Sequence, residues 1–114
     1  MGKFSRDKGQ RTERNIVHAM QERGFAAERI PLSGSAGGSF AGDVTMPLLS
    51  GDRIFEVKCR AEGFKFLYDS LKDHYGLIVK ADNKTPLVVM PLDEFLSVAE
   101  IAEAGKALAR ASDA

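Results

Sequence analysis

A charged stretch in the middle of the chain, Ile54–Cys59, is the feature that most limits the possible folds. It alternates apolar and charged side chains. Because successive side chains of a strand point to opposite faces, Glu56 and Lys58 would share one face and the apolar residues the other. The apolar face can pack into a core. The charged face needs another explanation, which is either exposure to solvent or chemistry.

The residues before this stretch predict its partner strand. Residues 41–48 alternate in the same way, with Asp43 on the polar side, and residues 50–52, Ser-Gly-Asp, predict a hairpin turn. Two strands joined by such a turn pair in antiparallel fashion. Asp43 would then lie at the same end of the hairpin as Glu56 and Lys58.

A helix is predicted over about residues 6–23, with Gly24 as its stop signal. A step back of three or four residues along its apolar stripe reaches Glu13, so a carboxylate is predicted on the side that faces the core. The stripe consists of Ile16, Val17 and Met20. Basic residues at other positions of the same half could meet a polyanion, and these are Lys3, Arg6, Lys8, Arg11 and Arg14.

The remaining elements follow from apolar runs and turn signals. We predict a strand over residues 25–31, a glycine-rich loop over 33–39, a helix over about 64–75, a second hairpin from 77–81 and 87–90 with both strands buried, and a last helix over 91–102. The loop lacks the P-loop ending and the dinucleotide-binding glycine pattern. We expect one domain over residues 1–114, in which residues 105–114 form a helical end or a frayed tail.

The composition is that of an ordinary globular chain, with 44% hydrophobic and 28% charged residues. No apolar run approaches the length of a membrane span and no signal-peptide core is visible, so we expect a soluble, cytoplasmic protein without a membrane partner. Cys59 is the only cysteine, which excludes an internal disulfide and a thiolate zinc site.

The charge is unevenly placed along the chain. Residues 1–30 carry seven basic and four acidic residues, whereas residues 91–114 carry two basic and five acidic residues. A basic N-terminal surface could engage phosphate, although solvated charge explains the same asymmetry.

Three carboxylates would converge if the first helix packs beside the hairpin. Glu13, Asp43 and Glu56 would then share one site with a single amine, that of Lys58. Such like charges repel, and a bound divalent cation is the natural compensation. Oxygen ligands without His or Cys favour Mg²⁺ or Mn²⁺. The alternative is a solvated strand face, because Glu and Lys two residues apart are common on such faces.

Three motifs together resemble the archaeal-type Holliday junction resolvases of the PD-(D/E)xK nuclease superfamily. They are Lys8-Gly9-x-x-x-Glu13-Arg14, the segment from Gly24-Phe25 through Arg29-x-Pro31-x-Ser33-Gly34, and Asp43-x12-Glu56-Val57-Lys58. The resemblance covers residues 8–60 closely and the later elements by their order. Gly42 stands where the superfamily's name expects proline, but this position shapes the backbone and supplies no ligand.

The resemblance implies an α/β fold of the restriction-endonuclease-like type. This is a mixed β-sheet of about five strands flanked by helices, in the order α-β-β-β-α-β-β-α. It also implies a homodimer that cleaves DNA phosphodiesters with Mg²⁺ (or Mn²⁺) and without an organic cofactor. Carried over by position, Glu13, Asp43 and Glu56 would be the metal-site carboxylates, and Lys58 would be the catalytic lysine.

The resemblance also assigns roles outside this carboxylate group. Ser33 matches a catalytic loop serine near the scissile phosphate. Lys8 and Arg29 match basic positions that contact DNA, and we expect Arg11 and Arg14 to contribute to the same interface because they lie on the first helix with Lys8.

We therefore expect a Mg²⁺-dependent, structure-selective endodeoxyribonuclease, in the first place a Holliday junction resolvase acting on branched or duplex DNA. One alternative is a nuclease of the same fold that acts on forks, flaps or phage packaging intermediates. Another is a catalytically silent DNA-binding module. The intact set of charged residues argues against silence, because crowded carboxylates have no purpose without chemistry.

The aromatic residues after the hairpin leave two interpretations open. They could stack on bases, but their helical spacing favours packing in a core or a dimer. The residues concerned are Phe64, Phe66, Tyr68 and Tyr75.

Overall fold

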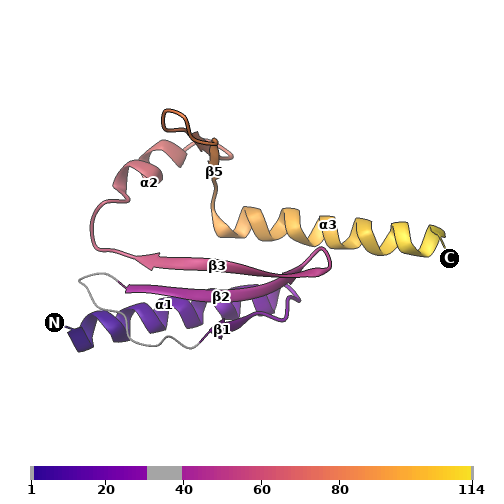
Figure 1. Ribbon diagram of the computed structural model, residues 1–114, viewed down its shortest axis with the longest axis horizontal. Coiled ribbons are helices and arrows are strands. Elements are labelled where there is room, and N and C mark those ends of the chain that lie inside the picture. The colour runs from indigo at the N-terminus through magenta and orange to yellow at the C-terminus, as the bar shows by residue number, and fades with distance from the viewer. Residues whose placement is uncertain (1, 31–39, 114) are drawn as a thin grey trace.

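The computed structural model describes residues 2–30 and 40–113, which form three helices and five strands (Figure 1). In chain order the elements are α1 (Gly2–Glu22), β1 (Glu28–Ile30), β2 (Phe40–Leu48), β3 (Gly51–Cys59), α2 (Lys65–Leu71), β4 (Leu77–Val79), β5 (Leu87–Val89) and α3 (Leu92–Asp113). The predicted order α-β-β-β-α-β-β-α is confirmed. Among the described residues, no helix is long and apolar enough to cross a membrane.

A three-stranded antiparallel sheet in the order β1-β2-β3 forms the centre of the fold. β2 and β3 pair along their whole length, from Phe40 opposite Cys59 to Leu48 opposite Gly51. The turn between them consists of Leu49 and Ser50, whose φ angles are 52° and 68°. A two-residue type I′ turn requires this sign at both positions.

The turn lies slightly earlier than the sequence predicts, because Gly51 is already the first residue of β3. Leu49 and Ser50 have positive φ angles, a backbone conformation that is unfavourable for residues with a side chain. Hydrogen bonds from α3 offset part of this cost. Glu103 accepts a hydrogen bond from the Leu49 N–H, and Arg110 donates one to Ser50 Oγ at 3.2 Å. The last helix therefore supports the turn of the hairpin.

One face of the sheet carries the core, and both long helices contribute to it. On the hairpin, buried Val44, Met46 and Val57 occupy alternate positions and so share one face. The cluster also contains Val17 and Met20 of α1, Phe25 and Ala27 of the next segment, and Leu96 and Ala99 of α3. The opposite face of the hairpin is polar and open to solvent.

A single arginine ties the end of α1 to the start of α3. The Arg23 guanidinium donates to Glu100 Oε1 at 2.8 Å, to Ser97 Oγ at 3.2 Å and to the Asp93 carbonyl at 3.4 Å. The hydrogen bond to Glu100 raises the pKa of Arg23 above its ordinary value, so the guanidinium stays charged at every physiological pH. α3 continues past Gly105 to Asp113 as a helix alongside the hairpin (Figure 1).

The five strands fall into two antiparallel sheets, in place of the one mixed sheet that was expected. β4 and β5 pair with each other, with Ile78 opposite Val88, and α2 carries them away from β3 (Figure 1). The prediction that both strands are buried is wrong, since no residue from Lys58 to Phe95 is buried.

The chain as a whole is extended. Its radius of gyration is 16.5 Å, against about 13 Å for a compact chain of this length. The part of the chain that contains α2, β4 and β5 therefore extends from the core and has no buried hydrophobic cluster of its own.

The two-faced hairpin predicts unequal effects of truncation. Met46→Ala should lower the free energy of unfolding by about 2–5 kcal/mol, because Met46 is buried in the core and leaves a cavity. Ile54→Ala, on the open face, should change it by less than about 0.5 kcal/mol. Urea denaturation followed by circular dichroism measures both. Similar losses in the two variants would show that the open face is packed in solution.

Candidate active site

The open face of the hairpin brings together three of the predicted catalytic residues. Asp43 of β2 lies directly opposite Glu56 of β3, and Lys58 follows Glu56 on the same face. Lys58 Nζ lies 3.5 Å from Glu56 Oε1. The side chains of Glu56 and Lys58 are 58% and 48% exposed, so they can reach a ligand without any rearrangement of the core.

The fourth predicted residue, Glu13, occupies a different environment. Its side chain is 1% exposed, which confirms that it lies on the core-facing side of α1. Arg29 Nε donates to Glu13 Oε1 at 2.5 Å. Arg29 lies opposite Val44 and thus on the helix-covered face of the sheet, so it reaches Glu13 across the space between β1 and α1.

The structure therefore separates the predicted set into two groups. Asp43, Glu56 and Lys58 share the open face, whereas Glu13 and Arg29 form an ion pair on the covered face. Arg29 was expected to contact DNA, and the structure shows a second task for it, the neutralisation of a buried carboxylate. Sequence spacing could place Glu13 in the core but gave no sign of its partner.

The other predicted positions are distributed as follows. Lys8, Arg11 and Arg14 are exposed on α1. Their half of the helix adjoins the end of β3, because Thr12 Oγ1 lies 3.6 Å from Cys59 Sγ. Ser33 lies outside the described residues. The roles of all these residues stay predictions.

The donor atoms of the site fit a hard divalent cation by their chemistry. Asp43 and Glu56 offer carboxylate oxygens side by side, and Glu13 Oε2 is a buried oxygen without a hydrogen-bond partner. Oxygen donors of this kind suit Mg²⁺ or Mn²⁺. Within residues 2–30 and 40–113, however, no three His, Cys, Asp or Glu side chains are grouped so that they could hold a metal ion together. The reason is that Asp43 and Glu56 lie on the open face of the sheet, whereas Glu13 lies on the covered face.

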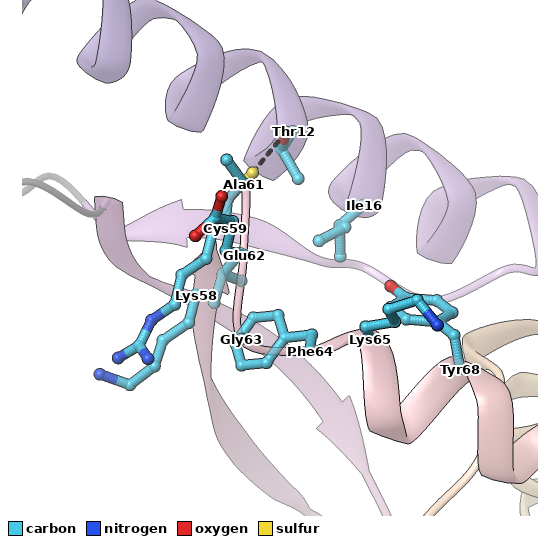
Figure 2. A pocket seen from close by; sticks show the side chains of 12 residues that line it. Thr12, Ile16, Lys58, Cys59, Ala61, Glu62, Gly63, Phe64, Lys65 and Tyr68 are labelled. Carbon is cyan, nitrogen blue, oxygen red and sulfur yellow. Dashed lines mark hydrogen bonds between the residues drawn. The ribbon is translucent and has the colours of Figure 1, made fainter.

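Sequence analysis did not anticipate a cavity of about 720 Å³ beside the site (Figure 2). It lies between α1, the end of β3 and the start of α2, and Lys58 belongs to both the cavity and the open face. The available signal is a pair of aromatic residues, Phe64 and Tyr68, whose helical spacing favours packing in a core or a dimer. Tyr68 is in fact exposed, and Phe64 is half-buried.

A helix with a core-facing glutamate, followed by an antiparallel hairpin that carries Asp and Glu-x-Lys on one face, is consistent with the PD-(D/E)xK class of nucleases. The model of the archaeal Holliday junction resolvase (Hjc) family matches residues 4–72, which is more than half of the 114 residues. The chain therefore belongs to this family of resolvase-type nucleases. A comparison with curated proteins gave no significant match, and neither did a comparison with solved structures.

The buried ion pair predicts a loss of stability that a second substitution reverses. Arg29→Ala should lower the free energy of unfolding by about 3 kcal/mol, because it leaves the Glu13 carboxylate buried and without its cation. In the double variant Glu13→Leu/Arg29→Ala, an apolar side chain replaces the orphaned charge, and much of the loss should be recovered. Urea denaturation measures both values.

Arg14→Ala is the matched control for this experiment. Arg14 is exposed on the same helix, so its loss should cost less than about 0.5 kcal/mol. Equal destabilisation of the Arg29→Ala and double variants would contradict a role for the pair in holding the fold together.

Proposed function

We propose that the protein is a Mg²⁺-dependent, structure-selective endonuclease that resolves Holliday junctions by hydrolysing phosphodiesters in branched DNA. The observation that carries this proposal is the placement of Asp43 opposite Glu56 with Lys58 beside them, on an exposed face, in a chain of the resolvase family. Two carboxylates and an amine at that spacing are more than a solvated strand face needs, and they match what phosphodiester hydrolysis requires.

Asp43 and Glu56 would hold the cation, Mg²⁺ or Mn²⁺, through their carboxylate oxygens. When bound, such a cation supplies charge stabilisation and lowers the pKa of coordinated water. Lys58 lies next to Glu56 with its side chain about half exposed. It can orient the attacking water or neutralise charge that develops on the scissile phosphate.

The roles of Glu13 and Arg29 depend on the ion pair that joins them. Glu13 is the third carboxylate of the predicted metal site, but Arg29 holds one of its oxygens in the structure. Glu13 lies on the covered face, so it could join the cation held by Asp43 and Glu56 only if its side chain moves. If that movement opens the ion pair, Arg29 becomes free to contact a phosphate. The free oxygen Oε2 supports such an exchange, because a buried carboxylate oxygen without a partner is costly to keep.

The DNA backbone would run along the exposed basic side of α1 toward the end of β3. Lys8, Arg11 and Arg14 are exposed there, and the contact between Thr12 and Cys59 places this part of α1 beside Lys58. Neutralisation of phosphates by such residues supplies affinity that does not depend on sequence. Binding should therefore weaken with increasing salt.

Cleavage assays with a labelled four-way junction and a matching linear duplex test the proposal. With Mg²⁺ the protein should introduce paired nicks in the junction in preference to the duplex, and with chelator it should cut neither. Asp43→Asn and Lys58→Ala should each reduce the cleavage rate about a hundredfold or more while DNA binding persists, because they remove groups needed at the reacting phosphate.

Asp52→Asn is the matched control, since Asp52 lies on the same face of β3 but near the turn. It should cleave at the wild-type rate. Full activity of Asp43→Asn would remove that residue from the mechanism, and the absence of metal-dependent cleavage of any DNA would overturn the proposal as a whole. Efficient cutting of forks or flaps without preference for junctions would instead select the alternative substrates.

We also propose that the nuclease acts as a homodimer, in which two sites cut two strands of one junction. The support is the uncovered hairpin of β4 and β5, where apolar side chains remain in water. Ile78 and Val88 are cross-strand partners on β4 and β5, and both are exposed. A second copy of the chain would cover them, because contiguous exposed apolar surface marks an interaction site.

Sedimentation velocity at micromolar concentration should show a dimer. Ile78→Asp should shift the protein toward monomer, since a carboxylate at this position would lose its hydration on association. Lys84→Asp, a charge change in the turn of the same hairpin, should leave the dimer intact. A wild-type monomer, or a dimer that is insensitive to Ile78→Asp, would contradict this surface.

A further inference from the structure

The cavity beside Lys58 combines an apolar wall with a basic rim. Ile16 of α1 faces Phe64 and Tyr68 of the opposite wall, whereas Lys58 extends away from α1 (Figure 2). Arg60 and Lys65 complete the basic part of the lining, against one acidic residue, Glu62. The volume of about 720 Å³ falls within the range of sites that hold small organic groups.

The aromatic part of the wall already takes part in one cation–π contact. The Arg60 guanidinium carbon lies 5.5 Å from the centre of the Phe64 ring, which is a cation–π distance. No ion pair involves Arg60 in the part of the chain that the structure describes. Arg60 is therefore a cation that is available to an anionic ligand and is held next to an aromatic ring.

We propose that this cavity receives one unstacked nucleobase of the bound DNA, with a flanking phosphate on Arg60. A nucleotide joins a flat ring to a negative charge, and the lining offers an aromatic wall beside an excess of positive charge. The proposal rests on the nuclease function above and adds to it. A strand whose base enters the cavity is positioned next to Lys58, so unpaired bases, such as those at a branch point, become the feature that the protein recognises.

Binding measured in chelator tests the cavity separately from cleavage. The probes are two fluorescently labelled duplexes with a single-nucleotide bulge, one carrying adenine and the other an abasic residue. The protein should bind the adenine bulge about fivefold or more tightly by fluorescence anisotropy, because base–aromatic stacking contributes at this level. Phe64→Leu and Tyr68→Ser should abolish the preference while retaining affinity for the abasic bulge.

Phe66→Leu is the matched control, because Phe66 lies on α2 between these two residues, is 60% exposed and does not line the cavity. It should keep the wild-type preference. Circular dichroism of each variant checks that it is folded.

The single cysteine gives a second measurement that needs no substitution. Cys59 lines the cavity and is half-buried, so its rate of alkylation by a maleimide reports occupancy. The adenine bulge should slow alkylation several-fold more than the abasic bulge. Alkylation that slows with rising protein concentration in the absence of DNA would show that a second copy fills the cavity, and this would overturn the proposal.

The remaining outcomes separate this inference from the nuclease function. Equal affinity and equal protection by the two bulges would overturn the base site, and the cleavage assay would still decide the function. Failure of junction cleavage together with a clear preference for the adenine bulge would overturn the function and retain the base site as that of a DNA-binding module.

Discussion

The long antiparallel pairing of β2 with β3 is the constraint on which the rest of the structure depends. Because side chains alternate along both strands, one register fixes which residues enter the core and which face solvent. Val44 and Met46 are buried in the same arrangement that exposes Glu56 and Lys58. A slip of one residue in either strand would send its charged residues into the core, so the packing of α1 and α3 also determines which residues occupy the open face.

The pairing of Glu13 with Arg29 is the second organising interaction, and it joins α1 to β1. A buried carboxylate is tolerated when a cation neutralises it, and Arg29 does this from a strand that is itself short and at the edge of the sheet. The second oxygen of Glu13, Oε2, stays buried without a hydrogen-bond partner. A cation that displaces Arg29 from Glu13 must therefore bring a positive charge, and an anion that displaces Glu13 from Arg29 must bring a negative charge.

Much of this arrangement could be predicted from the sequence. The alternation in Ile54–Cys59 predicted the strand and its charged face, and the stripe of α1 predicted that Glu13 faces the core; both are confirmed. These successes share a physical basis, since local periodicity is set by where the apolar side chains must go. The order of elements follows from the same signals.

Other features depend on contacts between distant residues, which periodicity does not encode. The turn falls at Leu49 and Ser50, although the glycine beside them gave the stronger local signal, because residues of α3 hold the turn from far along the chain. The ion pair between Glu13 and Arg29 joins α1 to β1, and the sequence pattern of neither element indicates this contact. β4 and β5 read as buried strands because they are apolar, yet burial requires a neighbour that the single chain does not provide.

The support that α3 gives to the hairpin turn has a consequence for how the protein folds. Leu49 and Glu103 are 54 positions apart, and Ser50 and Arg110 are 60 apart. Contacts between residues so distant in sequence form late, because the intervening chain must first lose its conformational freedom. A ribosome would release the hairpin well before the helix that steadies its turn. Until α3 docks, the turn end of the hairpin, which is distant from Asp43, Glu56 and Lys58, stays incompletely held.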